Sequence, residues 1–427
     1  MTNSRRNFIS KAFIGIAGSS FLLAADKNTL FAKHSEPVSL LANLDDSESY
    51  WEFVKSSFSL KPGLQYFNNG SLGPSPEIVI DATDKFRRMM DSFPSKYMWG
   101  GWNEEKEEVR RKSASLFGVS PEEIALIHNT TEGMNLVAKT LKLEPGDEVI
   151  LANHEHPSGT IPWKFWKERF GVKLVRPELP LVPKNVSELL DVYRKALTSK
   201  TKVISMCHMV NTNGMILPVQ EVSEMAHRKG IKVVVDGAQS AGMFDFNLKE
   251  LGCDFYAASS HKWLYSPKGM GIFYASENVQ EMIEPLIVAN GYEDRTIRRF
   301  ENYNSRNLPE LLGLGTALDF HNLIGAAKKE KRIFDLKKYF LNKIEGSKSF
   351  IVKTPRPNTL SCGIQNVEIV GKNVKDCAKI LDEKFSINVR PMTSHSLNGL
   401  RISLSVFNTK ADVDYLLDSM NEIAEMN

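Results

Sequence analysis

The chain has 427 residues, more than a single hydrophobic core usually serves, so we expect a large domain and a smaller one. Apolar residues make up 42% of the chain and charged residues 25%, which are ordinary values for a globular protein and exclude the disordered and fibrous classes. The 54 basic and 51 acidic residues leave a formal net charge of +3, and this near balance predicts no nucleic-acid partner.

The first residues have the layout of an export signal. Arg5 and Arg6 stand side by side, and an apolar stretch rich in small residues follows at 12–25. Because a spanning helix needs ~20 apolar residues, a retained membrane anchor is the less favoured alternative. We assign residues 1–32 to a twin-arginine signal peptide, with cleavage after one of three alanines, Ala24, Ala25 or Ala32.

The twin-arginine route carries folded proteins, so an enzyme that acquires its cofactor in the cytoplasm has a reason to use it. We therefore expect an exported protein, periplasmic or otherwise extracytoplasmic, with the twin-arginine export machinery as a partner. No other segment of the sequence is apolar and long enough to be expected to span a bilayer.

Strands and helices alternate beyond an N-terminal segment at 33–65. The alternation predicts an α/β fold, in which a mainly parallel sheet is covered by helices on both faces. We assign the large domain to residues 66–310. Its seven expected strands lie at 124–128, 148–152, 173–176, 202–208, 232–236, 255–259 and 271–274.

The C-terminal part, 311–427, has a different pattern, which we interpret as a helical connection followed by a smaller α+β domain. Its expected elements, in chain order, are helices at 311–323 and 326–343, a strand near 359–368, a helix at 374–384, a strand near 400–406 and a helix at 410–426.

Four cysteines are scattered along the chain without the spacing of a disulfide framework or of a zinc site. We expect no metal site and interpret all four as small apolar residues of strands or helix faces. They are Cys207, Cys253, Cys362 and Cys377.

A lysine stands in a polar turn directly after the expected strand 255–259. Ser259 and His261 accompany Lys262, and their hydroxyl and imidazole groups are suited to binding a phosphate. A lysine fixed at a strand end beside such groups is what a Schiff base to pyridoxal 5′-phosphate (PLP) requires. A lone lysine in this place would usually be an exposed surface charge, so the assignment depends on two further segments.

These segments contain Asp236 and the pair Thr130 and Thr131. Asp236 ends an apolar strand, where a buried carboxylate needs a cationic partner, and a protonated pyridine nitrogen would supply one. Thr130 and Thr131 open a helix after a strand, so their hydroxyls and free amides form a seat for a phosphate. Ordinary helix capping is the alternative interpretation of both segments.

Together the three segments resemble the class V aminotransferase family of fold-type-I PLP enzymes, which includes the cysteine desulfurases and isopenicillin N epimerase. The resemblance covers roughly 66–407. It implies that His156 stacks on the cofactor ring and that Asn211, assisted by Gln239, reaches the cofactor's phenolic oxygen. It also implies that Asn69 belongs to the substrate site and that Arg401 binds the substrate carboxylate with its guanidinium fork.

The segment 304–307 matches the family only loosely. In the family, a Gly-Thr segment at this place crosses from the neighbouring subunit to the phosphate of the cofactor. Ser305 keeps a hydroxyl, whereas the glycine is missing. From this match, and from the habit of the family, we expect a homodimer.

The stretch before Arg401 bears on the reaction. Desulfurases carry a cysteine there, whereas residues 392–399 contain none, and we expect His395 to be an exposed loop residue. The chain therefore resembles the epimerase-like branch, in which Lys262 removes and returns the α-proton of an amino acid. Epimerisation, aminotransfer and elimination share the same first step, so an isomerase, a transferase and a lyase all stay open. The alternatives are a desulfurase-like enzyme without the usual cysteine and an exported binding protein without turnover.

Overall fold

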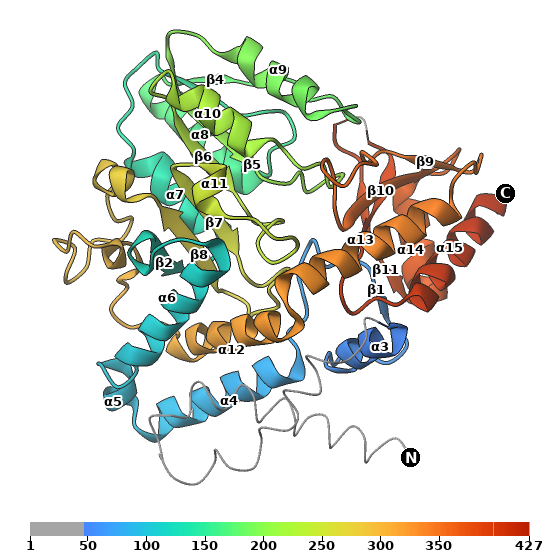
Figure 1. The fold of residues 1–427 in the computed structure, drawn as a ribbon, viewed down its shortest axis with the longest axis horizontal. Coiled ribbons are helices and arrows are strands. Elements are labelled where there is room, and N and C mark those ends of the chain that lie inside the picture. The colour runs from blue at the N-terminus through green and yellow to red at the C-terminus, as the bar shows by residue number, and fades with distance from the viewer. Residues whose placement is uncertain (1–46, 396, 427) are drawn as a thin grey trace.

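The computed structural model describes residues 47–395 and 397–426 (Figure 1). The expected twin-arginine signal, with Arg5 and Arg6, lies outside the described residues. Within the described part of the chain, no helix is long and apolar enough to cross a membrane.

Seven strands form one large sheet, in the order β2-β8-β7-β6-β5-β3-β4. Every neighbouring pair is parallel except the two that β8 makes with β2 and β7. The predicted α/β fold with a mainly parallel sheet is thus confirmed. The strands are β2 (Ile124–Ile127), β3 (Glu148–Ile150), β4 (Lys173–Val175), β5 (Thr201–Cys207), β6 (Lys232–Asp236), β7 (Phe255–Ser259) and β8 (Gly271–Ala275).

Helices cover both faces of this sheet. Successive side chains of a strand point to opposite faces, so in a strand covered on both sides all of them are buried. In β6, Val234 packs with α7 and α8, whereas Val233 and Val235 pack with α6, α9 and α10 on the other face. An uninterrupted apolar run is therefore the pattern of a central strand here. The helices are α6 (Asn103–Phe117), α7 (Thr130–Thr140), α8 (Pro157–Phe170), α9 (Val186–Ala196), α10 (Val219–His227) and α11 (Leu248–Leu251).

Further helices border the large sheet and connect it to the rest of the molecule. The long α12 packs against α4 and α6 along the lower edge in Figure 1. These elements are α4 (Glu77–Ser92), α5 (Pro94–Met98) and α12 (Leu308–Ile324), and the 3-10 helices η2 (Pro121–Glu123), η3 (Glu277–Met282) and η4 (Ile297–Glu301).

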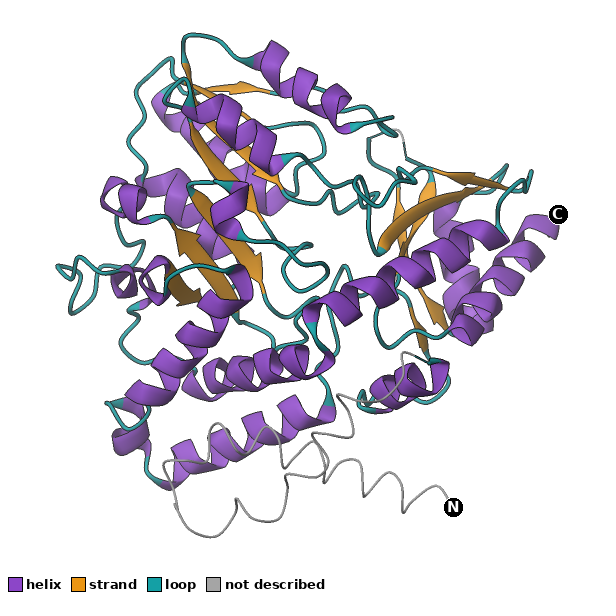
Figure 2. Cartoon of the chain, viewed as in Figure 1, coloured by secondary structure: helices purple, strands orange, loops and turns teal. Residues whose placement is uncertain are grey.

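A smaller antiparallel sheet follows, in the order β12-β13-β10-β9, and Figure 2 shows it as a separate group of strands with its own helices. The sequence predicted β10 and β13, whereas the three-residue strands β9 and β12 are too short to show an alternating pattern. The elements are α13 (Ala326–Lys343), β9 (Phe350–Val352), β10 (Ile364–Ile369), α14 (Val374–Phe385), β12 (Arg390–Met392), β13 (Gly399–Ser403) and α15 (Lys410–Glu425).

The largest differences from the predicted strand boundaries occur in the small sheet. The strand predicted from residue 359 begins only at Ile364, because a turn closed by Leu360 N–H and Pro357 O (3.0 Å) precedes it. The strand predicted to residue 406 ends at Ser403, because a second turn begins at Ser405 and is closed by the Asn408 N–H (3.0 Å).

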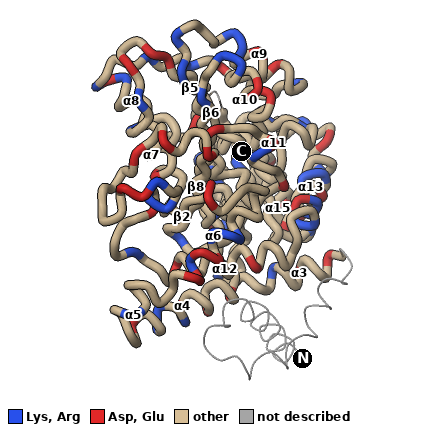
Figure 3. The backbone as a smooth tube through the Cα atoms, turned by 60° about the vertical axis from the view of Figure 1, so that its left-hand side comes forward, with Lys and Arg blue, Asp and Glu red and all other residues tan. Residues whose placement is uncertain are grey.

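The N-terminal elements pack on the C-terminal part. The strand β1 (Gln65–Tyr66) pairs in parallel with β11 (Ile387–Asn388), and α3 (Glu48–Ser56) is tied to α15 by a 2.6 Å ion pair between Lys55 and Asp412. This long-range pairing carries the residues after β1 toward the edge of the large sheet. Figure 3 shows Lys and Arg interspersed with Asp and Glu along most elements, as the near balance of charge predicts.

Candidate active site

Three neighbouring strands of the large sheet end side by side. The last residues of β5, β6 and β7 are Cys207, Asp236 and Ser259, and Cys207 lies directly opposite Asp236. Because parallel strands carry their carboxyl ends to the same edge of a sheet, the loops that follow them converge there. The predicted site residues are found in and around these loops.

Lys262 lies in the turn after β7, partly buried. The segment after β1 supports this turn, because Gly73 N–H donates to His261 O (2.9 Å) and Asn69 Nδ2 donates to Lys262 O (3.4 Å). A Cβ at position 73 would lie 2.1 Å from Lys262 O, so only glycine fits. Burial lowers the pKa of Lys262 to about 8; the charge of Asp236 opposes this shift and that of Arg401 adds to it.

Asp236 is 4% exposed at the end of β6. Its Oδ1 accepts a hydrogen bond from Ala238 N–H (2.9 Å), so the carboxylate does cap the turn that follows, as the alternative interpretation held. Its charge nevertheless acts on both Lys262 and His156. Asp236 therefore combines the capping contact with a place beside two of the predicted catalytic residues.

His156 is the N-cap of α8. Its Nδ1 accepts from Ser158 N–H (3.2 Å) and lies 3.0 Å from Ser158 Oγ, which orients the imidazole. Burial lowers the pKa of His156, and the charges of Lys262 and Arg401 add to this effect against the opposing charge of Asp236. The imidazole ring is therefore neutral, and it lies near Asp236 and Lys262.

The predicted phosphate seat lies at the start of α7. Thr130 N–H donates to Ser259 Oγ (2.9 Å), and the two hydroxyl oxygens are also 2.9 Å apart, so β7 and α7 are joined here. Thr131 Oγ1 donates to Ser158 Oγ (3.0 Å), which links the seat to the loop of His156. His261 is partly buried, and its Nδ1 has no hydrogen-bond partner among the described residues. Burial lowers the pKa of His261 to about 4, so the imidazole is neutral.

Arg401 comes from β13 of the small sheet and is 1% exposed. Its guanidinium donates to Asn68 Oδ1 (3.0 Å), to Asn211 O (3.1 Å) and to Ser71 Oγ. Its buried Nε has no partner among the described residues. Burial lowers the pKa of Arg401 to about 9, so the group has lost solvation that no carboxylate of the described chain replaces.

Three other predicted residues lie close to this group. Asn69 is fully buried and, as noted, contacts the Lys262 backbone, while its Oδ1 is unpartnered among the described residues. Asn211 contributes its backbone carbonyl to Arg401. Gln239 accepts from Trp263 Nε1 (3.0 Å) and donates to Gly70 O (2.7 Å), so its amide ties two backbone segments of the site together. Its expected contact with a cofactor stays a prediction.

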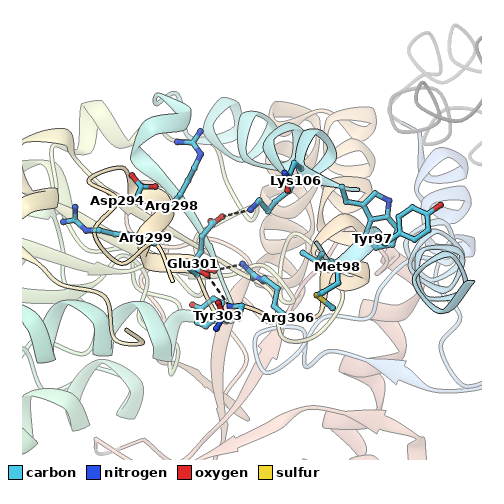
Figure 4. Close-up of a pocket in the computed structure, with 15 residues that line it drawn as sticks. Tyr97, Met98, Lys106, Asp294, Arg298, Arg299, Glu301, Tyr303 and Arg306 are labelled. Atoms are coloured by element: carbon cyan, nitrogen blue, oxygen red, sulfur yellow. Dashed lines mark hydrogen bonds and ion pairs between the residues drawn. The ribbon is translucent and has the colours of Figure 1, made fainter. Parts of the chain in front are cut away.

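Ser305 stands apart from these residues, on an exposed loop between η4 and α12. The loop passes the start of α7, because Tyr303 Oη hydrogen-bonds Glu132. A pocket of about 270 Å³ opens beside it, lined among others by Tyr97, Lys106 and Arg306 (Figure 4). The contact of Ser305 with the phosphate site of a neighbouring subunit stays a prediction.

A buried acid next to the site, Glu155, is not among the residues predicted from the sequence. Glu155 is 7% exposed, its carboxyl lies beside Cys207, and its Oε1 has no hydrogen-bond partner among the described residues. Burial, with the nearby charge of Asp236, raises the pKa of Glu155 to about 8. The signal was its position, since it directly precedes His156.

A second arginine at the site was not predicted either. Arg390 lies in β12, directly opposite Arg401 in β13, and its guanidinium donates to Ser71 Oγ (3.2 Å). Its charge acts on Lys262 and His156. Because the strand β12 was not predicted, the pairing could not be seen. His395 is exposed, as expected, and its ring lies 4.6 Å from that of His154.

The residues present fit PLP. The seat at α7 offers a helix N-terminus and the hydroxyls of Thr130, Thr131 and Ser259 to a phosphate. His261, two residues after Ser259, has a ring nitrogen without a partner among the described residues. Asp236 offers a carboxylate to the pyridine nitrogen, His156 a flat neutral ring, and Lys262 an amine whose lowered pKa leaves part of it uncharged near neutral pH. The donor set thus matches the phosphate, the ring and the aldehyde of the cofactor.

Comparisons with known proteins agree with this geometry. Residues 65–416 match the family model described as aminotransferase class-V. Isopenicillin N epimerase of Streptomyces clavuligerus is 28% identical over 390 residues, which cover 87% of this chain and 98% of the relative. A probable cysteine desulfurase of Halalkalibacterium halodurans is 31% identical over 392 residues, covering 85% and 93%.

A solved structure gives the same fold. It is a lysine-to-alanine mutant of C-DES with glycine covalently linked to its PLP cofactor, and it superposes with a TM-score of 0.77. The match covers 87% of this chain and 99% of C-DES at 21% sequence identity. The α/β architecture is therefore that of a PLP-dependent fold.

Proposed function

The chain belongs to the aminotransferase class-V family and is a PLP-dependent enzyme, and from this premise we propose that it acts at the α-carbon of an amino acid in the manner of isopenicillin N epimerase. The observation that carries the proposal is the meeting of Lys262, Asp236 and Arg401. Asp236 ends β6 and Lys262 follows the neighbouring strand β7, while Arg401 bonds Asn68, next to the Asn69 that donates to Lys262 O. These residues come from two strand ends of the large sheet and from the small sheet.

Bound PLP supplies an electron acceptor that makes the α-hydrogen of a linked amino acid acidic. Lys262 is the base in this proposal, because its lowered pKa leaves a useful fraction of the amine uncharged near neutral pH. Asp236 would hold a proton on the pyridine nitrogen and so keep the ring able to accept electrons. His156, neutral and held by Ser158, would pack on the cofactor ring.

Arg401 orients the substrate by binding its α-carboxylate. The guanidinium is buried, carries an unpartnered Nε, and is itself held by Asn68 and Asn211. A carboxylate arriving there would replace the solvation that burial removed, and bidentate binding would fix the direction of the α-hydrogen. Thr130, Thr131, Ser259 and His261 hold the phosphate in this proposal.

A desulfurase-like reaction is the second candidate, favoured by the names of several relatives. Transfer of sulfur to the protein requires a reactive thiolate. All four cysteines are buried, and burial raises the pKa of each thiol, that of Cys362 to about 12. The thiol of Cys207, at the end of β5, is buried, and the nearby charges of Glu155 and Asp236 raise its pKa further. These features favour the epimerase-like reaction over persulfide formation.

The experiment is an amino-acid screen in deuterated buffer with the PLP-loaded enzyme. An accepted substrate exchanges its α-hydrogen, which mass spectrometry detects whichever product follows. The appearance of the opposite enantiomer, of an oxo acid or of an elimination product then distinguishes an isomerase, a transferase and a lyase. Exchange with no amino acid of either configuration would contradict the proposal, and a stoichiometric persulfide formed on the protein from cysteine would favour the desulfurase.

We propose a homodimer, with the loop of Ser305 close to the neighbour's phosphate seat. Large apolar side chains are exposed in segments next to residues that line the pocket beside this loop: Trp99, which follows Met98, is 66% exposed, and Val288, three residues before Gly291, is 71% exposed. Exposed apolar side chains of this kind suit contact with a second copy. Sedimentation should find a dimer that Trp99→Glu weakens by roughly tenfold or more, whereas Ile351→Glu, on the small sheet, should not. A fully active monomer would contradict the dimer.

We also propose export by the twin-arginine route. Arg5 and Arg6 support it by their place before the apolar stretch 12–25. Replacing both with lysine keeps the charge and should leave the folded, PLP-loaded protein in the cytoplasm, which cell fractionation measures. Normal export of the double variant would exclude this route.

A further inference from the structure

Two arginines face each other across one pair of strands at the site. Arg390 of β12 is the direct antiparallel partner of Arg401 of β13. Both guanidiniums donate to the same oxygen, Ser71 Oγ, Arg390 at 3.2 Å. Like charges directly opposite each other in an antiparallel pair repel, so this arrangement costs stability unless an anion compensates it.

The described chain provides no such anion. The hydrogen bonds of both guanidiniums go to neutral oxygens, those of Ser71, Asn68 and the Asn211 backbone. The charges that act on Arg401 come from Arg390, which lowers its pKa, and from Tyr66. Lys262 adds a third positive group, since both arginines lower its pKa.

The acids nearby do not balance these charges. Asp236 faces Lys262 and, in the proposed function, is paired with the cofactor. Glu155 holds its proton near neutral pH because burial raises its pKa to about 8. Two guanidinium charges are therefore left for whatever the enzyme binds.

The two guanidiniums lie at different depths. Arg401 is 1% exposed, whereas Arg390 is exposed to solvent. The hydroxyl of Ser71 lies between them and bonds both, so it fills the position where a single bridging carboxylate would otherwise bind. This geometry offers two separate anion contacts, one buried and one at the rim.

We propose, on the basis of the proposed function, that the substrate is an amino acid with a second carboxylate. Arg401 binds the α-carboxylate in the interior, and Arg390 binds the distal carboxylate at the rim. Arg390 is thus the residue that determines selectivity for acidic substrates. Binding of both carboxylates relieves the repulsion between the two arginines. A substrate with only one carboxylate leaves one arginine without a counter-charge and is therefore disfavoured.

The test compares substrates of matched shape. Rates of α-hydrogen exchange are measured with glutamate and glutamine, and with aspartate and asparagine, in both configurations, on the PLP-loaded enzyme. We expect kcat/KM to favour the acid over its amide by roughly tenfold or more, since a charge-assisted contact is lost with the amide. In Arg390→Gln this ratio should fall toward one. Arg228→Gln, which removes an exposed arginine at the end of α10, should leave the ratio as in the wild type.

A binding measurement gives a second readout that needs no turnover. Glutarate and butyrate lack the amine, so they report carboxylate binding alone, and calorimetry measures their affinity for the PLP-loaded enzyme. Glutarate should bind roughly tenfold or more tightly than butyrate, and Arg390→Gln should remove this advantage.

The outcomes separate this inference from the proposed function. Equal exchange of acids and amides by the wild-type enzyme, or an equal loss with both in Arg390→Gln, would overturn the dicarboxylate substrate while the α-carbon chemistry stands. If no amino acid of the wider panel exchanges its α-hydrogen, the proposed function itself is wrong. The comparison of glutarate with butyrate then tests the two-arginine site independently of that function.

Discussion

Each sheet carries a pair of like groups close together. At the edge of the large sheet they are two acids, Asp236 and Glu155, and on the small sheet they are two arginines, Arg390 and Arg401. The acids are balanced within the chain: Glu155 keeps its proton because burial raises its pKa to about 8, and Asp236 caps a turn and faces Lys262. The arginines bond only neutral oxygens.

The difference follows from protonation. A carboxyl beside another carboxyl can become neutral at a modest cost, whereas a guanidinium stays charged under all ordinary conditions. A pair of acids can therefore be stable without a ligand, and a pair of arginines requires one. We infer that the large sheet activates the cofactor and the small sheet selects the substrate.

The largest effect is expected from removing Lys262, on which the charges of Asp236, Arg390 and Arg401 all act. Lys262→Ala should abolish the borohydride-sensitive absorbance of the lysine-linked cofactor and reduce α-hydrogen exchange by about a thousandfold or more, because both the covalent link and the base are lost. Far-ultraviolet circular dichroism should be unchanged, since the phosphate seat and both sheets stay intact. A variant that still exchanges α-hydrogen at the wild-type rate would remove Lys262 from the chemistry.

Asp236→Ala tests the acid pair. Some cofactor should still bind through the phosphate seat, but exchange should fall by roughly a hundredfold or more because the pyridine nitrogen loses its charged partner. Asp245→Ala removes an exposed carboxylate outside the site and serves as the control. Turnover close to that of the control would show that Asp236 is only a cap.

Glu155→Gln tests whether the second acid is neutral. The folded pKa of about 8 lies above the ordinary value of 4.5, so the native state holds the proton more tightly than the unfolded chain. The contribution of this group to stability is complete below pH 4.5 and is lost as the pH rises to about 8.

Relative to Glu155→Gln, the wild-type protein should therefore lose about 2–3 kcal/mol of unfolding free energy between pH 6 and pH 9. Chemical denaturation of both proteins across this range measures the difference. A constant difference at every pH would mean that Glu155 is already ionised, and the acid pair would then need a counter-charge just as the arginines do.

The smallest effect is expected from Cys207→Ala. The variant removes a buried sulfur from the core and should reduce the unfolding free energy by about 1 kcal/mol, the usual cost of deleting one methyl-sized buried group. Exchange of the α-hydrogen should change little, because this thiol faces Glu155 and has no part in the proposed chemistry. Loss of sulfide production from cysteine in this variant would make Cys207 a sulfur acceptor and favour the desulfurase.

Local sequence determined much of this protein. The apolar run before Asp236, the Ser-Ser-His-Lys turn and the threonines after β2 carry enough information to predict the strands, the helix start and the cofactor, because strand burial and helix capping depend on neighbouring residues. The seven strands and the mainly parallel sheet followed from the same local patterns.

Tertiary structure alone decided how distant segments meet. The pairing of β1 with β11 brings Asn69 to the lysine turn, and the short strand β12 places Arg390 opposite Arg401. Glu155 gains its raised pKa only when β5 and β6 enclose it. Such contacts join residues far apart in the chain. The burial and repulsion that they produce exist only once the chain is folded, so no local sequence pattern predicts them.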